Sequence, residues 1–132
     1  VGQGLAVLIS KNNRVIIYDV GASYPSGFNM ADSVLLPILQ ARGLLKVDLV
    51  FISHGDNDHA GSLPQLLKGV QVAEVLTNQD HCQQNLDISW QGLRIKALWP
   101  DDALYGYVKN VILDVMLKKS ARPPYCLLPL LR

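Results

Sequence analysis

A run of four apolar residues, Leu49-Val50-Phe51-Ile52, passes without a break into a mostly polar segment that extends from Ser53 to His59. An uninterrupted apolar run of this length, rich in β-branched and aromatic side chains, predicts a strand that is covered on both faces. Polar side chains directly after such a strand lie at a sheet edge, where open α/β folds place their ligands. This junction therefore predicts both a buried sheet and the position of a site.

The order of the remaining patterns predicts an α/β fold in which helices pack on a mixed sheet. Apolar runs at residues 5–9 and 15–18 flank a polar turn and predict a β-hairpin. A loop is expected at 21–29, followed by a helix that is capped by Asp32 or Ser33, has Pro37 in its first turn and ends before Gly43. The strand at 49–52 comes next, and then a helix from Leu63 to Gly69 and a strand at 74–77. Last come a hairpin around Gln91-Gly92 and a weaker strand at 111–117.

The composition indicates a folded single domain. The chain has 132 residues, of which 49% are hydrophobic and 17% are charged, which supports a packed core and argues against disorder. The net charge is +1, so the totals predict no strong basic patch for nucleic acid. No apolar run reaches the roughly 20 residues needed to cross a bilayer. Cys82 and Cys126 fit neither a zinc-ribbon spacing nor a disulfide framework, so we expect two unrelated thiols.

Residues 54–59 carry the candidate chemistry, because they hold two of the chain's three histidines and two aspartates. His54 and Asp56 alternate along an extended stretch and can point to one side, while Asp58 and His59 are expected at the opening of the next helix. Two ionised carboxylates repel each other, as do two protonated imidazoles. A divalent cation removes both repulsions, because it neutralises the carboxylates and keeps each imidazole neutral as a nitrogen donor. This ligand set suits zinc, manganese or iron.

Each of these residues also has an ordinary structural interpretation when it is taken alone. Asp58 could cap the following helix, Asp56 and Asn57 could form a turn, and both histidines could be exposed loop residues. The clustering of all four side chains favours a metal site over these interpretations.

Three short motifs occur in order along the first hundred residues: Val1-Gly2-Gln3-Gly4 before an apolar strand, Tyr18-Asp19-Val20-Gly21, and Ser53-His54-x-Asp56-Asn57-Asp58-His59-x-Gly61. The last motif resembles the His-x-His-x-Asp-His signature of metallo-β-lactamase-fold hydrolases, with aspartate in place of the second histidine. The ordered set resembles the N-terminal half of the metallo-β-lactamase-like domain of ComEC-type DNA-uptake (competence) proteins. The resemblance implies an αββα sandwich, here truncated to a mixed sheet with helices packed on it.

The resemblance also implies a role for each motif residue in a site for two divalent ions. His54 and Asp56 would bind the first ion, and Asp58 and His59 the second, with Asp58 serving as the catalytic residue as well. Asp19 would support the metal loops without ligating. In a complete domain, a hydroxide shared by two metal ions would attack the substrate. Zinc or manganese is the expected metal, and the carboxylate of Asp56 should shift the preference from zinc toward manganese or magnesium.

The likeness to the family fades beyond about residue 105. The family's second half supplies a further ligand histidine, a bridging aspartate after a Thr-Gly pair and a late histidine, and none of these is recognisable here. Neither His81 nor Asp114 matches those motifs. We therefore expect residues 1–105 to form a metallo-β-lactamase-like half-domain and residues 106–132 to be a divergent tail, altered or truncated.

The function that the resemblance implies is a metal-dependent phosphodiesterase or nuclease that acts on one strand of incoming DNA. The parent protein would be a membrane channel of the inner membrane, with this domain on the outer, periplasmic face. Two alternatives stay open. The same fold and metals could serve a lactam or thioester hydrolase, or the chain could be a catalytically inactive fragment or binding module that keeps half of the ligands.

Overall fold

The computed structural model describes residues 4–77, 87–96 and 130–131, and the chain divides into two compact units, residues 1–77 and 78–132. Several expectations lie outside the described residues and stay predictions. These are the strand at 111–117, the domain boundary after residue 105, and the parts played by His81, Cys82, Asp114 and Cys126.

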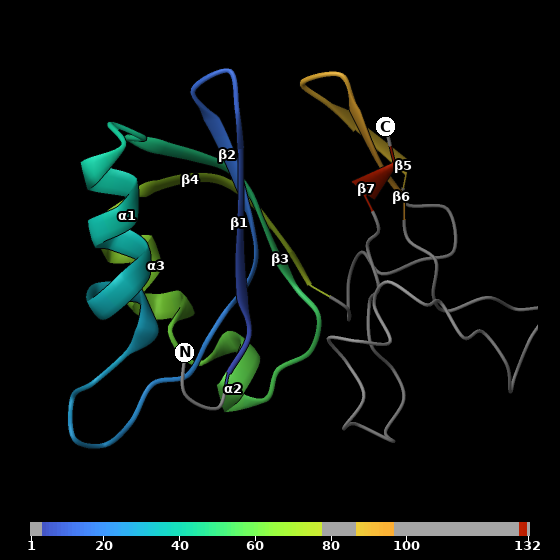
Figure 1. Ribbon diagram of the computed structural model, residues 1–132. Helices are drawn as coiled ribbons and strands as arrows, with labels where there is room; N and C mark the ends of the chain where they lie inside the picture. The colour runs from blue at the N-terminus through green and yellow to red at the C-terminus, as the bar shows by residue number, and fades with distance from the viewer. Residues whose placement is uncertain (1–3, 78–86, 97–129, 132) are drawn as a thin grey trace, which may run out of the picture. The chain divides into compact units, whose positions relative to one another are not determined.

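The first unit is built on a four-stranded mixed sheet in the order β1-β2-β3-β4. The strands are β1 (Ala6–Lys11), β2 (Arg14–Val20), β3 (Lys46–Ile52) and β4 (Gln71–Thr77). Strand β2 is antiparallel to β1 and parallel to β3, and β3 is parallel to β4. Helices lie against one face of this sheet (Figure 1). The predicted α/β architecture with a mixed sheet is confirmed, although β3 and β4 begin earlier than their apolar runs indicate.

Two asparagines close the hairpin between β1 and β2. Asn12 has a φ of 52° and Asn13 a φ of 59°. Two consecutive positive φ angles make a type I′ turn, whose twist matches that of the antiparallel strands it joins. Asparagine adopts this left-handed region more readily than most residues other than glycine. The predicted hairpin is therefore confirmed, and its sequence accounts for the tightness of the turn.

A π-helical turn, η1 (Ala31–Leu35), leads directly into helix α1 (Leu36–Ala41). The backbone N–H of Leu36 donates to the carbonyl of Ala31, a step of five residues. Pro37, the next residue, has no N–H to donate and stands in the first turn of α1. The proline is therefore accommodated in the first turn of α1, as predicted, but the helical segment starts a full turn before it.

The cap predicted at Asp32 or Ser33 is wrong, because Asn29 supplies the capping side chain. Oδ1 of Asn29 accepts a hydrogen bond from the backbone N–H of Asp32 at 2.8 Å, and Nδ2 of Asn29 donates to the Asp32 carboxylate at 2.7 Å. A side-chain oxygen three residues before the N–H that it binds is the geometry of an N-terminal cap. The predicted stop at Gly43 is confirmed, since this glycine follows α1 with a φ of 65°.

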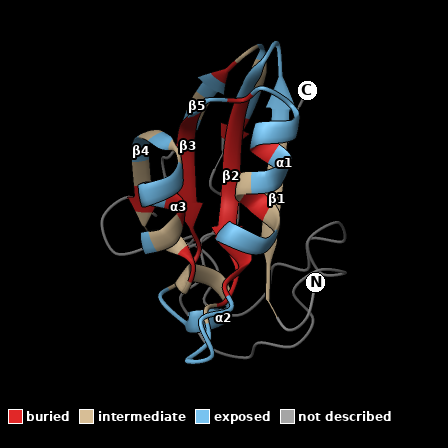
Figure 2. Ribbon diagram, turned by 90° about the vertical axis from the view of Figure 1, so that its left-hand side faces the viewer, coloured by how far each residue is buried: buried red, intermediate tan, exposed pale blue. Residues whose placement is uncertain are grey.

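The hydrophobic core lies between the sheet and the helices. Its buried members come from β2, β3, η1, the helices and the connection between α1 and β3: Val15, Ile17, Val20, Ala31, Leu35, Leu39, Leu44, Val47, Val50, Ile52 and Leu66. Ile16 and Phe51, which alternate with Ile17 and Val50 and so face the other way, are also buried. Strands β2 and β3 are accordingly buried along their length (Figure 2), as their continuous apolar runs predict.

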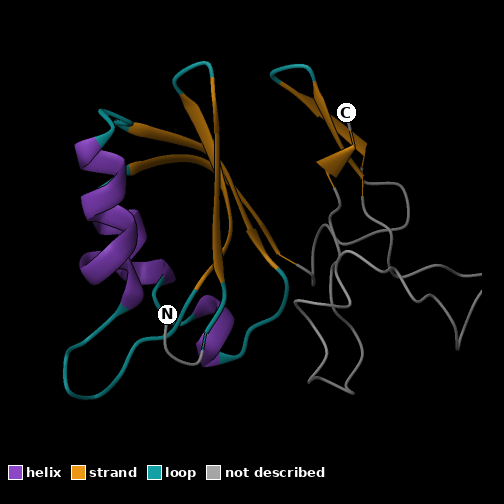
Figure 3. Cartoon of the chain, in the orientation of Figure 1, coloured by secondary structure: helices purple, strands orange, loops and turns teal. Residues whose placement is uncertain are grey.

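The segment after β3 forms two helices, α2 (Asn57–Ala60) and α3 (Leu63–Gly69). The pattern predicts that Asp58 and His59 open the helix that ends at Gly69, but they lie in the separate single turn α2. The break falls at Ser62, and Pro64 follows in the first turn of α3, where its missing N–H costs no hydrogen bond. Figure 3 shows α2 apart from α1 and α3, at the end of the sheet where β2 and β3 finish. In the described ranges no helix is long and apolar enough to cross a bilayer.

The second unit contains a small antiparallel sheet in the order β5-β6-β7. Its strands are β5 (Asp87–Trp90), β6 (Leu93–Lys96) and β7 (Leu130–Leu131). Gln91 and Gly92, with φ angles of 50° and 76°, join β5 to β6 in a two-residue turn. This confirms the hairpin that Gln91-Gly92 predicts.

Candidate metal centre

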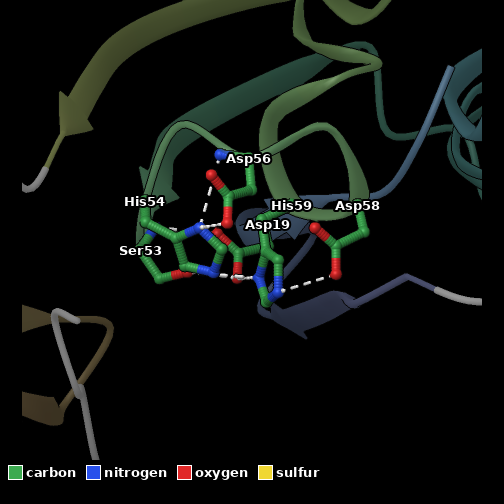
Figure 4. Close-up of polar contacts among 6 residues, drawn as sticks. All are labelled: Asp19, Ser53, His54, Asp56, Asp58 and His59. Atoms are coloured by element: carbon green, nitrogen blue, oxygen red, sulfur yellow. Dashed lines mark hydrogen bonds and ion pairs between the residues drawn. The ribbon is translucent and has the colours of Figure 1, made fainter. Parts of the chain in front are cut away.

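The predicted ligands lie where the parallel strands β2 and β3 end. Asp19 is the last residue but one of β2, and Ser53 directly follows β3. Residues 54–59 continue from Ser53 into α2. Figure 4 shows the side chains of this segment gathered beside Asp19 and Ser53: His54, Asp56, Asp58 and His59. The structure therefore places the four predicted residues at the sheet edge, as the pairs His54–Asp56 and Asp58–His59.

Asp19 occupies a β-bulge at the end of β2. Ala6 pairs with Val20 and Val7 pairs with Tyr18, so Asp19 is an additional residue between two cross-strand pairs. Its φ of 54° lies in the left-handed region, which aspartate tolerates better than most side chains. The bulge interrupts the alternation of the strand, and the side chain of Asp19 is fully buried.

The carboxylate of Asp19 connects the beginning of the polar segment to its far end. Its Oδ1 accepts the backbone N–H of Ser53 at 2.7 Å, and its Oδ2 accepts the Ser53 hydroxyl at 2.7 Å. Oδ2 also lies 2.7 Å from Nδ1 of His59. An ionised carboxylate can only accept, so we place the imidazole proton on Nδ1. Three donors thus compensate for the burial of a charged group.

This tautomer leaves Nε2 of His59 as the ring atom that can bind a metal ion. Oδ2 of Asp58 is 3.4 Å from Nε2, so a nitrogen and a carboxylate oxygen lie side by side. Histidines that bind metals usually donate their other ring N–H to a carboxylate, which fixes the orientation of the ring. Asp19 supplies that carboxylate to His59 at 2.7 Å. The arrangement is that of a metal-binding histidine with its supporting acid.

The protonation of His59 is set by two opposing effects. Burial would lower the pKa of His59, but the hydrogen bond to Asp19 and the charges of Asp19, Asp58 and Asp56 together outweigh burial and raise the pKa. A raised pKa means that a proton and a metal ion compete for Nε2. Metal binding at His59 should therefore strengthen as the pH rises.

His54 and Asp56 form a second pair of candidate donors. Nδ1 of His54 accepts a hydrogen bond from the backbone N–H of Asp56 at 3.3 Å and lies 3.5 Å from Oδ2 of Asp56. The imidazole rings of His54 and His59 are 3.8 Å apart between centroids and inclined by 46°. Burial, and then the neighbouring His59, lower the pKa of His54. The neutral ring that this favours is the form that binds metal ions.

These residues fit a divalent cation in chemistry, but they are arranged in pairs. Imidazole nitrogens and carboxylate oxygens are the donors that zinc and manganese accept. Within the described ranges, however, no three His, Cys, Asp or Glu side chains lie together in a group that could hold a metal ion. The carboxylates of Asp56 and Asp58 are 72% and 51% exposed, so they are free to turn. The assignment of the four ligands and of a catalytic Asp58 stays a prediction.

Asn57, which sequence reasoning treats only as a turn former, fastens the polar segment to the loop after β2. Its Nδ2 donates to the carbonyl of Ser23 at 2.9 Å, and its Oδ1 accepts from the Ser23 backbone N–H at 3.3 Å and hydroxyl at 3.4 Å. A Cβ on Gly61 would lie 2.2 Å from Oδ1 of Asn57. The close approach of Asn57 therefore explains why the motif has glycine at position 61. The spacing of Asn57 and Gly61 in the motif is the signal from which the role of Asn57 could have been predicted.

Three further hydrogen bonds help to hold this segment in place. The hydroxyl of Ser62 donates to the carbonyl of Ala22 at 2.6 Å and accepts the backbone N–H of Met30 at 2.8 Å, and Ser62 is fully buried. The backbone N–H of Leu5 donates to the carbonyl of Asp58 at 3.0 Å. A Cβ on Gly4 would stand 3.0 Å from the same carbonyl, which accounts for a glycine just before β1.

Comparison with known proteins assigns the chain to a family. Residues 1–113 match the family model described as the metallo-beta-lactamase superfamily. The chain belongs to the metallo-β-lactamase superfamily. The predicted fold class, an α/β domain of the metallo-β-lactamase type, is thereby confirmed. This superfamily comprises hydrolases that generally bind divalent metal ions.

The resemblance to competence proteins is confirmed as well. Recombination protein 2 of Haemophilus influenzae is 39% identical over 113 residues, which cover 79% of this chain and 14% of that protein. Competence protein ComA of Neisseria gonorrhoeae is 29% identical, covering 76% of this chain and 15% of that protein. Ribonuclease J of Corynebacterium glutamicum is 34% identical, covering 52% of this chain and 10% of that protein. The chain thus spans only 10–15% of the length of these relatives.

Proposed function

We propose that this chain carries the first half of a metal-dependent phosphodiesterase centre that cleaves one strand of DNA in a competence protein. The observation that carries the proposal is the geometry of His59. Its Nδ1 is held by the buried Asp19 at 2.7 Å, and its Nε2 lies 3.4 Å from the Asp58 carboxylate. A ring fixed in this way has its coordinating atom aimed beside a second donor before any metal arrives.

Each pair of donors would serve one cation. Asp58 and His59 would hold one ion and His54 with Asp56 the other, while Asp19 keeps the proton of His59 on Nδ1. Divalent ions bound there would lower the pKa of a water molecule and stabilise negative charge on the oxygens of a phosphodiester. The protein contributes the ligands, the supporting carboxylate and a segment that Asn57 and Ser62 hold in place.

The donor set argues for manganese over zinc. A carboxylate at Asp56, where related hydrolases have a second histidine, adds a hard oxygen donor and a negative charge. Hard oxygen donors suit manganese and magnesium, whereas additional imidazoles suit zinc. We therefore propose manganese as the preferred ion of this centre.

The remaining ligands of a complete site are proposed to come from outside the described residues. In the described residues the candidate metal ligands occur in pairs. A catalytic metal ion in a protein ordinarily has about three protein ligands. This observation also favours a second candidate, a chain that binds metal weakly and does not catalyse. A metal titration separates the two candidates, because only a complete centre retains the ion tightly.

The phosphodiester substrate is proposed from the relatives. One relative is named a competence protein and another a ribonuclease. We accordingly propose single-stranded DNA as substrate. We also propose a membrane channel as the rest of the parent protein, with this domain on the periplasmic face of the inner membrane.

The test combines calorimetry with cleavage assays on the full chain. Manganese should bind more tightly than zinc, and His59→Ala should weaken binding at least tenfold, by analogy with the 10–100-fold losses seen around metal sites. Glu74→Ala, an exposed carboxylate on β4, is the matched control and should bind manganese like the wild type. Labelled single-stranded DNA should be cleaved with manganese, whereas nitrocefin and a thioester should not. Cleavage of nitrocefin or the thioester alone would overturn the substrate assignment.

A further inference from the structure

The loop between β2 and η1 presents two half-exposed aromatic rings. Tyr24 is 44% exposed and Phe28 is 46% exposed. Their ring centroids are 6.0 Å apart and their planes are inclined by 42°. Each ring exposes apolar surface to water, and burial of that surface against a ligand would lower the free energy. A pair of exposed aromatic rings on one short loop is therefore a candidate contact for a ligand.

The backbone of this loop is held in one shape by its own hydrogen bonds. The N–H of Tyr24 donates to the carbonyl of Phe28 at 2.8 Å, and the N–H of Gly27 donates to the carbonyl of Tyr24 at 3.0 Å. Ser23 and Asn29 pair as an isolated antiparallel bridge at the base. The rings are therefore presented on a hairpin-shaped loop that its own hydrogen bonds constrain, and such constraint reduces the entropy lost on binding.

The same loop is fastened to the candidate metal centre. Ser23 is hydrogen-bonded to Asn57 through three contacts. Tyr24 directly follows Ser23, and Asp58 directly follows Asn57. The hydrogen-bonded pair Ser23 and Asn57 therefore links Tyr24 to the predicted ligand Asp58. The loop and α2 lie at the same end of the sheet (Figure 1).

The described Lys and Arg residues of the first unit lie at the opposite end of the sheet from this loop. These Lys and Arg residues stand at the end of β1, at the start of β2 or β3, near the end of α3 or directly after α1: Lys11, Arg14, Lys46, Lys68 and Arg42. In the described part of this unit, the aromatic pair therefore has no Lys or Arg beside it to attract a phosphate. A ligand that gains affinity here must do so through its planar apolar groups.

We propose that Tyr24 and Phe28 form a platform on which a nucleobase of a single-stranded nucleic acid stacks while a neighbouring phosphodiester lies at the candidate metal centre. This inference rests on the proposed nuclease function and adds how the substrate is held. Bases of a single strand have free faces, whereas the bases of a duplex are stacked on one another. Stacking on aromatic side chains accepts every base, so the platform selects single strands without selecting sequence.

The experiment measures binding, so it does not depend on catalysis. Fluorescence anisotropy is recorded for the full chain with a labelled single-stranded oligothymidylate and with an abasic strand of the same length. Calcium replaces manganese so that the strands stay intact. The double variant Tyr24→Ala/Phe28→Ala should bind the base-bearing strand about fivefold to a hundredfold more weakly, the range that stacking of one base provides. Its affinity for the abasic strand should not change.

Two control variants make the result specific to the platform. Leu45→Ala removes a leucine that is 80% exposed beyond the end of α1 and should leave both affinities unchanged. Tyr24→Phe keeps the ring and should retain binding. The proposal is overturned if the double variant binds the base-bearing strand as the wild type does, if both strands lose affinity equally, or if neither strand binds.

A parallel cleavage assay separates this proposal from the proposed function. Wild-type cleavage of single-stranded DNA with manganese, together with an unchanged affinity in the double variant, would reject the platform and leave the nuclease standing. A base-dependent affinity without any cleavage would support the platform as a binding surface and reject the nuclease.

Discussion

Replacement of Asp19 by asparagine tests how the metal-binding atom of His59 is prepared. Asparagine has the same shape and tolerates the left-handed φ of 54° that residue 19 adopts, so the backbone should be preserved. Its Oδ1 can still accept the backbone N–H of Ser53. Its NH2 group, however, takes the place of the oxygen that lies 2.7 Å from both the Ser53 hydroxyl and Nδ1 of His59.

The expected magnitudes follow from these contacts. A hydrogen bond to a charged acceptor contributes about 1.5–3 kcal/mol and a neutral one about 0.5–1.5 kcal/mol. Asp19 accepts three such bonds, and the uncharged asparagine avoids part of the desolvation that a buried carboxylate suffers. We expect Asp19→Asn to lower the free energy of unfolding by about 2 kcal/mol. Because Nδ1 then faces a donor, the ring proton moves to Nε2, and manganese affinity should fall roughly 10–100-fold.

Three measurements on the variant check this reasoning. Urea denaturation gives the free energy of unfolding, calorimetry gives the manganese affinity, and nitrogen NMR of the imidazole ring identifies the protonated atom. Asp87→Asn, which changes an exposed carboxylate paired with Arg94, is the control and should alter stability by less than about 0.5 kcal/mol. The reasoning is refuted if Asp19→Asn binds manganese with wild-type affinity and His59 still carries its proton on Nδ1.

Three other predictions concern the segment around the site and its support. Gly61→Ala should destabilise the chain by about 1–3 kcal/mol in urea, because a Cβ would stand 2.2 Å from Oδ1 of Asn57; an unchanged midpoint would contradict this close contact. Leu66→Ala should lower the free energy of unfolding by about 2–5 kcal/mol in the same assay, because Leu66 is fully buried in the core. A decrease of less than about 1 kcal/mol would show that the core around Leu66 is not packed as described. The raised pKa of His59 should stabilise the metal-free chain below about pH 6.5, and this contribution should disappear as the pH rises through the folded-state pKa. Wild type should therefore lose stability relative to His59→Gln as the pH rises above about 6.5, and parallel profiles would refute the assignment.

Much of the fold could be predicted because its signals are local. The apolar runs of β2 and β3 indicated strands buried on both faces. Asn12, Asn13 and Gly92 are residue types that two-residue turns favour. The cluster from His54 to His59 could be singled out as a candidate site because its members lie within six residues of one another. Each of these features depends on neighbours in sequence, which a pattern can detect.

The contacts that organise the site could not be predicted in the same way, because they join distant residues. Asp19 meets Ser53 and His59 across 34 and 40 positions, and Asn57 meets Ser23 across 34. The bulge that gives Asp19 a positive φ arises only from its pairing with β1. The mistaken cap at Asp32 or Ser33 has a similar origin, because a π-helical turn before Pro37 moves the start of the helix back to Asn29.

The most direct test of the central claim follows manganese by NMR in the wild-type chain. Substoichiometric manganese should broaden the imidazole signals of His54 and His59, because paramagnetic relaxation falls steeply with distance. The backbone amide of Leu45 should stay sharp, since it precedes the seven-residue strand β3 and lies about 23 Å from the site at about 3.3 Å per residue. Sharp histidine signals in the presence of manganese, or broadening as strong at Leu45 as at His59, would contradict a metal centre formed by these residues.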